Sequence, residues 1–227
     1  MPHPTTSRAF ELRHLQLARA FFAAVAAVMI TFSADHSAPV GLAVFSGFAI
    51  ATAIVLFVAA WVVFPAASRA MPIALGAVTV ATGMIAGIPA LRTTETFFVL
   101  VVAWALVTGL IEGIAGFRAM RAANRGTAAR SEARDGATVG VITVLLGLGL
   151  LLVPARYALQ YYIQEAGQSF TLTGIAIGVG IFGGYAAIVG VYLAIAAFSP
   201  RRQTPQHSPV TPGAGTSAVA STREGSS

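Results

Sequence analysis

The chain has 227 residues, of which 56% are hydrophobic and 10% charged, with a formal net charge of +6. Soluble domains carry about 25% charged residues, so this composition predicts an integral membrane protein. The absence of cysteine excludes disulfides, thiolate metal sites and cysteine nucleophiles. All 14 basic residues are arginines that flank apolar stretches. This arrangement favours membrane topology and anionic lipid, rather than nucleic acid, as the reason for the positive charge.

Six apolar stretches are long enough to cross a bilayer, which takes about 20 mostly apolar residues. They predict transmembrane helices over 15–33, 39–63, 70–89, 96–117, 137–154 and 172–198. Segment 1–12 is a polar lead, and the tail 199–227 is rich in Pro, Ser, Thr and Gly, a composition typical of disorder. We therefore expect an all-α integral membrane protein with one membrane domain over 13–198.

The arginines set the expected orientation, because positively charged loops stay in the cytoplasm. Twelve arginines fall on the side that carries both termini, and only Arg92 and Arg156 fall on the other. Both termini should therefore be cytoplasmic in a cell-membrane protein. Five of the twelve lie in the 118–136 loop, where we expect contact with anionic lipid at the cytoplasmic face.

The segment between the fifth and sixth spans shows a helical period. The i, i+3, i+4, i+7, i+8, i+11 spacing is followed by the apolar residues Ala155, Ala158, Leu159, Tyr162, Ile163 and Ala166. This pattern predicts an amphipathic helix over about 155–168 that lies along the outer surface. It would either anchor in lipid or bind a periplasmic partner.

The sixth span contains Gly178, Gly180 and Gly183 in the G-x-G-x-x-G spacing of dinucleotide-binding turns. That reading requires a preceding strand and an acidic residue about 20 positions later, whereas position 203 is Gln and the motif lies inside an apolar run. Small residues instead allow close helix packing in lipid. The glycines expected to pack are Gly76, Gly83, Gly109, Gly113, Gly140, Gly147, Gly178, Gly184 and Gly190.

The chain also aligns with itself. A shift of 56 residues places the first two spans on the next two without a gap, so that Ala20 falls on Gly76 and Phe48 on Trp104. Gly140 and Tyr185 continue these positions in the third pair. The pattern predicts three repeated helical hairpins around a pseudo-threefold axis, with the 155–171 region as an insertion in the third.

Two stretches carry a family resemblance. "FFVLVVAWALVTGLIEGIAGFRAMR" (97–121) and "VGVITVLLGLGLLLVP" (139–154) resemble helices of the HdeD-like acid-resistance membrane proteins of bacteria. The resemblance extends over about 13–200, although the first unit has Ala20, Ala27 and Ala53 where glycine would be expected. It implies a six-helix, non-enzymatic protein of the cytoplasmic membrane, linked to acid stress in some members.

Glu112 is the only carboxylate well inside an expected span. A charge at membrane depth is costly and marks either a packing contact or a site for protons or substrate. Arg19 is its expected partner, because the first and fourth helices run in opposite directions and place both residues at similar depth. The pair would then connect these two helices.

The sequence leaves three functions open. The first is a non-catalytic protein that supports acid or envelope stress tolerance. The second is a small transporter or channel lined by Glu112 and by Thr52, Thr79, Thr82 and Thr108. The third is an assembly subunit that forms homo-oligomers or binds other membrane proteins through glycine faces and the outer helix. No H-E-x-x-H, P-loop or G-x-S-x-G motif occurs, so we expect neither an enzyme nor a cofactor or metal site.

Overall fold

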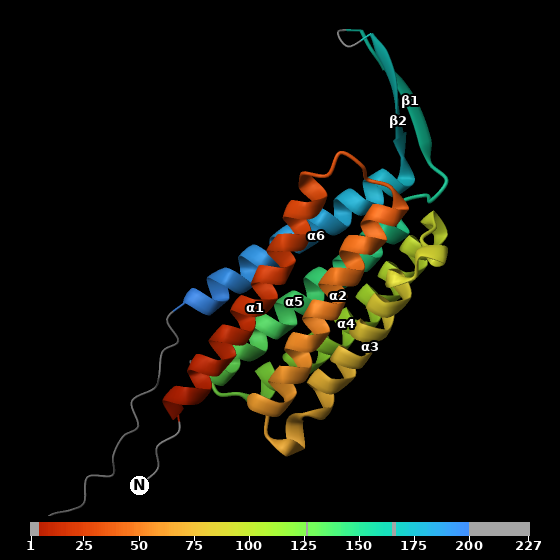
Figure 1. Ribbon diagram of the computed structural model, residues 1–227. Helices are drawn as coiled ribbons and strands as arrows, with labels where there is room; N and C mark the ends of the chain where they lie inside the picture. The colour runs from red at the N-terminus through yellow and green to blue at the C-terminus, as the bar shows by residue number, and fades with distance from the viewer. Residues whose placement is uncertain (1–4, 126, 165–166, 200–227) are drawn as a thin grey trace, which may run out of the picture.

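A bundle of six long helices forms the body of the protein. The computed structural model describes residues 5–125, 127–164 and 167–199, and six helices in that part of the chain are long and apolar enough to cross a membrane. They are α1 (Thr5–Thr31), α2 (Ala38–Val62), α3 (Ala70–Gly87), α4 (Thr94–Ala122), α5 (Ala128–Leu151) and α6 (Gly174–Phe198). Consecutive helices alternate in direction (Figure 1). The expected all-α, six-span membrane protein is confirmed.

Threonine caps set the start of three helices. The side chains of Thr93, Thr127 and Thr173 each accept a hydrogen bond from a backbone N–H in the first turn of α4, α5 and α6. Because Thr127 is a cap, α5 begins at Ala128 and not at 137. Its first turns are rich in Ala and Arg, which favour helix, while the charged residues there lower the hydropathy. Likewise α1 begins at Thr5, inside the expected polar lead. The predicted disorder of 199–227 falls, beyond position 199, outside the described residues.

The helices form a closed ring in the order α1 to α6, with α6 packed against α1. The most extensive contacts join α2 to α3, α4 to α5 and α6 to α1. The two helices within each predicted repeat unit therefore contact each other less than they contact the neighbouring unit. The arrangement as repeated hairpins stays a prediction.

Most of the expected glycines lie at helix contacts. A Cβ atom on Gly140 of α5 would collide with the backbone of Gly113 in α4, and one on Gly109 would lie 2.8 Å from the Val144 nitrogen. On α6, a Cβ on Gly190 would lie 3.2 Å from the Ala24 nitrogen of α1. These close backbone approaches explain why α4–α5 and α6–α1 pack so extensively. The other positions face side chains: Gly76 faces Phe57, Gly83 faces Ala49 and Ile50, Gly147 faces Leu106, and Gly178 faces Phe97 and Phe98.

Gly184 is a correction to the expected set. It is exposed, and a Cβ built there would meet nothing within 4 Å. Its neighbour Gly183 packs instead, where a Cβ would lie 2.7 Å from Ile30 of α1. One residue turns a helix by about 100°, so the two adjacent glycines face different directions and only Gly183 reaches α1.

The expected amphipathic helix over 155–168 is wrong. The chain forms an antiparallel hairpin of β1 (Ala158–Ile163) and β2 (Gln168–Thr173), with Ala158 paired to Thr173. β1 contains Tyr and Ile and β2 contains Phe and Thr, residues that favour extended backbone over helix. Gly167 adopts a φ of 62°, a turn conformation that suits glycine. The hairpin projects beyond the helix ends (Figure 1).

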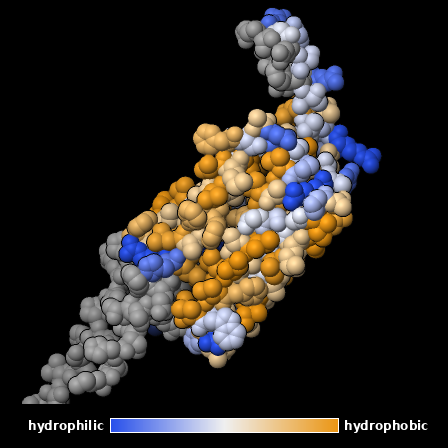
Figure 2. Space-filling model, in the orientation of Figure 1, coloured by the Kyte–Doolittle hydropathy of each residue, from blue (hydrophilic) through white to orange (hydrophobic). Residues whose placement is uncertain are grey.

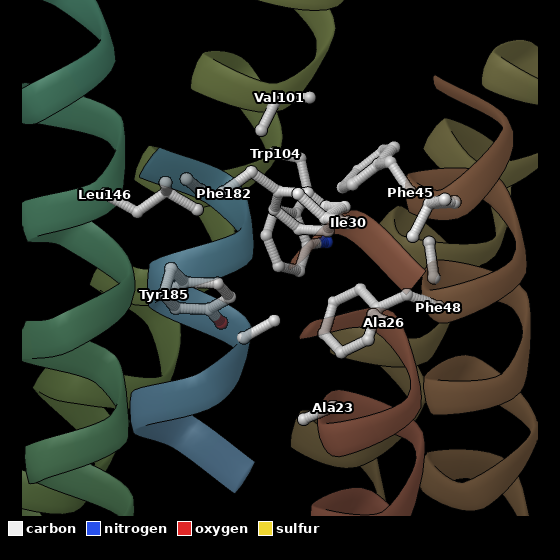
Figure 3. Packing of buried hydrophobic residues seen from close by; sticks show 14 of the residues in the cluster. Ala23, Ala26, Ile30, Phe45, Phe48, Val101, Trp104, Leu146, Phe182 and Tyr185 are labelled. Carbon is white, nitrogen blue, oxygen red and sulfur yellow. The ribbon is translucent and has the colours of Figure 1, made fainter. Parts of the chain in front are cut away.

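Aromatic rings from α2, α4 and α6 meet at the centre of the ring of helices. Phe45 contacts Trp104 and Phe182 edge to face, with centroid distances of 5.2 and 5.5 Å, and Trp104 contacts Tyr185 at 6.2 Å. Figure 3 shows these side chains converging with Phe48. The face of the bundle shown in Figure 2 is mainly apolar, and hydrophilic residues gather toward its two ends. This distribution fits helices surrounded by lipid.

Candidate functional site

The structure brings Glu112 and Arg19 together inside the bundle. Arg19 Nη1 donates to Glu112 Oε1 at 3.0 Å, and Nη2 donates to Oε2 at 3.4 Å. This is the two-pronged geometry in which a planar guanidinium matches a carboxylate. The side chains retain 20% and 11% of their exposure, respectively, so each charge is largely removed from solvent.

The pair spans the centre of the ring. Arg19 lies on α1 and Glu112 on α4, which occupy opposite positions in the ring and do not pack extensively against each other. The long arginine side chain therefore crosses the interior to reach α4. An unpaired charge here would be costly, and the opposite charge offsets that cost. The pair thus connects two helices that helix packing alone leaves apart.

A small cavity adjoins the pair and is lined by apolar and polar residues from all six helices. The volume open to the centres of water molecules is about 30 Å³. Its polar lining consists of Arg19, Thr52, Thr79, Thr108, Glu112, Thr143 and Tyr185. The cavity lies between the central aromatic rings and the end of the bundle where α1 begins and α6 ends, here called the terminal end.

The cavity residues fit the internal alignment. Under the 56-residue shift, Leu56 falls on Glu112 and Arg19 falls on Leu75. Both leucines line the same cavity as the ion pair. In the internal alignment, Leu56 and Leu75 therefore take the places of Glu112 and Arg19.

Hydrogen bonds satisfy most of the polar groups in the cavity wall. Trp104 Nε1 donates to Thr79 Oγ1 at 3.2 Å, and the hydroxyls of Tyr185 and Thr143 lie 3.0 Å apart. Thr108 Oγ1 donates to the Trp104 carbonyl at 2.6 Å. Among the described residues, Thr52 Oγ1 has no hydrogen-bond partner. These contacts fix the two aromatic side chains against α3 and α5.

Three of the four threonines proposed to line a path, Thr52, Thr79 and Thr108, do line the cavity. The fourth, Thr82, donates to the carbonyls of Val78 and Thr79 in its own helix, each at 3.0 Å. Sequence reasoning missed Thr143 and Tyr185 as polar members of the site. The signal was available, since Tyr185 occupies the same repeat position as Trp104 and both carry a polar atom.

A second carboxylate became visible only in the structure. Asp135 is buried and accepts a hydrogen bond from the Tyr192 hydroxyl of α6 at 3.1 Å. It was overlooked because the fifth span was expected to begin at 137. This contact ties α5 to α6 near the terminal end.

Several arginines that set the expected membrane orientation also donate hydrogen bonds to backbone carbonyls at helix ends. Arg69 Nε donates to the Phe64 carbonyl at 3.0 Å just after α2, and Arg92 donates to Ala86 and Gly87 at the end of α3 at 3.3 and 3.2 Å. Arg130 donates to the Met120 and Ala123 carbonyls after α4 at 2.7 and 3.2 Å. The last carbonyls of a helix lack partners within it, and cations are favourable there.

Within the described part of the chain, no three His, Asp or Glu side chains lie close enough to hold a metal ion. No family model matches the chain. No curated protein and no solved structure match it either. The six long apolar helices make the chain a multi-pass membrane protein.

Proposed function

We propose that this is a non-catalytic multi-pass protein of the cell membrane that supports tolerance of acid or other envelope stress. The observation that carries the proposal is the packing along the centre of the bundle. Aromatic rings from α2, α4 and α6 contact one another there, and the Arg19–Glu112 pair crosses the same interior nearer the terminal end. The resemblance of 97–121 and 139–154 to HdeD-like helices supplies the link to acid stress.

The interior suits a robust bundle better than a passage. A cavity of about 30 Å³ has room for about two water molecules and is small for a passage. The polar groups around it are engaged mainly with one another, and the ion pair joins helices on opposite sides of the ring. We infer that the protein works through the tight packing of its membrane domain.

The test measures the survival of a strain of the source organism that lacks the gene, and compares it with the same strain carrying the gene on a plasmid. After a shift to acid medium, the deletion strain should survive less well, and the plasmid should restore survival. Equal survival of the two strains under acid, osmotic and detergent stress would contradict the proposal.

The proposed orientation, with both termini in the cytoplasm, rests on the arginine distribution. Because the chain has no cysteine, single variants give a clean signal with a membrane-impermeant maleimide. His36→Cys should be labelled from outside intact cells, and Arg125→Cys only after the membrane is opened. Labelling of Arg125→Cys alone in intact cells would reverse the topology.

Transport is the second candidate, because Glu112 and Thr52, Thr79 and Thr108 line one cavity. Proton uptake into liposomes that contain the purified protein distinguishes the two functions. The stress-tolerance proposal predicts uptake no faster than in empty liposomes. Uptake that is rapid in the wild type and absent in Glu112→Gln would favour transport.

A further inference from the structure

The hydroxyl of Thr52 is an exception among the buried threonines of the bundle. Thr108 and Thr143 donate to the carbonyl four residues earlier in their helices, at 2.6 and 2.8 Å. Thr52 is 7% exposed, and its Oγ1 has no partner among the described residues. A hydroxyl away from water is costly when it makes no hydrogen bond, and lipid offers none. A hydrogen-bond partner from outside the described residues would remove this cost.

The cavity that Thr52 lines has the right size for a very small ligand. On the measure by which the volume is about 30 Å³, one water molecule needs about 10–15 Å³. The cavity therefore has room for about two water molecules.

The Arg19–Glu112 pair supplies the remaining hydrogen bonds. A guanidinium has five N–H donors, and two of those on Arg19 point to the carboxylate. A carboxylate accepts about four hydrogen bonds, of which Arg19 supplies two. Donors and acceptors are therefore left over next to the cavity. The pair is neutral as a whole, so a cation would meet Arg19 and an anion would meet Glu112.

We propose that the cavity is a binding site for one or two internal water molecules, held by the Thr52 hydroxyl and the Arg19–Glu112 pair. The water satisfies Thr52 and completes the hydrogen bonding of the pair. The site is distinct from the proposed stress function, since it concerns what occupies the interior.

Radiolytic labelling tests the site directly in the full-length protein in lipid nanodiscs. Synchrotron X-rays split bound water into hydroxyl radicals, which oxidise adjacent side chains even when these are buried. Phe48 and Phe45 form a matched pair, because both are buried on α2 but only Phe48 lines the cavity. Mass spectrometry should show faster oxidation of Phe48 than of Phe45. Equal rates would overturn the proposal.

Variants connect the water to Thr52. Thr52→Val removes the hydroxyl at nearly constant size and should slow the oxidation of Phe48, whereas Thr52→Ser should preserve it. Thr82→Val is the control, because the Thr82 hydroxyl bonds within its own helix, and it should leave the rate unchanged. An unchanged rate in Thr52→Val would overturn the role of Thr52.

Two further measurements separate water from the alternatives. In a dry cavity, Thr52→Val would remove an unpaired hydroxyl and raise the melting temperature. In a hydrated cavity it removes a bonded one, so we expect no increase, and an increase would contradict the proposal. Replacing sodium chloride by choline chloride should leave Phe48 oxidation unchanged, and a dependence on sodium would assign the site to a cation instead.

Discussion

The strongest prediction concerns the removal of the buried ion pair one partner at a time. Arg19→Leu leaves the Glu112 carboxylate without its cation, and Glu112→Leu leaves the guanidinium without its anion. With the side chains 20% and 11% exposed, neither charge can regain full hydration. Breaking one partner of such a pair costs about 3–5 kcal/mol, and we expect the lower end because some exposure remains.

The double variant should behave differently. Leu56 and Leu75 already occupy the corresponding positions in the wall of the same cavity, so the combination of Arg19→Leu and Glu112→Leu extends an existing apolar pattern. Replacing a buried pair by apolar residues is often neutral or stabilising. We therefore expect the double variant to lie within about 1 kcal/mol of the wild type.

The assay is reversible unfolding in mixed micelles, followed by circular dichroism as the denaturing detergent increases. Arg118→Leu is the control, because this arginine is exposed on α4 and should have almost no effect. Strictly additive losses in the double variant would refute the reasoning. They would mean that the two charges do not stabilise each other.

The remaining predictions use the same unfolding assay. Gly140→Ala should cost about 1–3 kcal/mol because its methyl group would collide with the backbone of α4, whereas Gly184→Ala should be neutral; equal effects would contradict the helix contacts. Trp104→Phe should lower the free energy of unfolding by about 1 kcal/mol, because the hydrogen bond to Thr79 is lost. When Thr79→Val has already removed that bond, Trp104→Phe should cause no further loss. Arg130→Gln should cost about 0.3–1 kcal/mol at the end of α4, and more at low salt than at high salt. Replacing 158–171 by a short Gly-Ser linker should leave the unfolding midpoint unchanged, because among the described residues the main contact of the strands with the helices is that of β2 with α6; a large loss would show that the hairpin stabilises the bundle.

Much of the fold was predictable because the bilayer imposes a simple constraint. A spanning segment must be long, apolar and internally hydrogen-bonded, so hydropathy finds all six helices. The Arg19–Glu112 pair was predictable for a related reason. A lone carboxylate at membrane depth requires a partner, and helix direction left Arg19 at the matching depth.

The errors have physical causes as well. In the segment before α6, the spacing of the apolar residues fits a helix over a short stretch. The Tyr, Ile, Phe and Thr residues of the same segment favour strands instead, and β1 and β2 pair as a hairpin. The start of α5 was missed because hydropathy measures lipid affinity, whereas the Thr127 cap and the Ala-rich first turn decide where the helix begins. The cavity could not be derived at all, because it depends on how all six helices are placed around the ring.

The most direct test of the central claim is acid survival of the deletion strain when it carries the Arg19→Leu, Glu112→Leu double variant. If the protein acts as a tightly connected membrane domain, this variant should restore survival to the wild-type level, while each single variant should restore less. Immunoblots of the membrane fraction must show that all variants are present in equal amounts. Failure of the double variant at normal abundance would contradict the account, because it would show that the charges themselves perform the function.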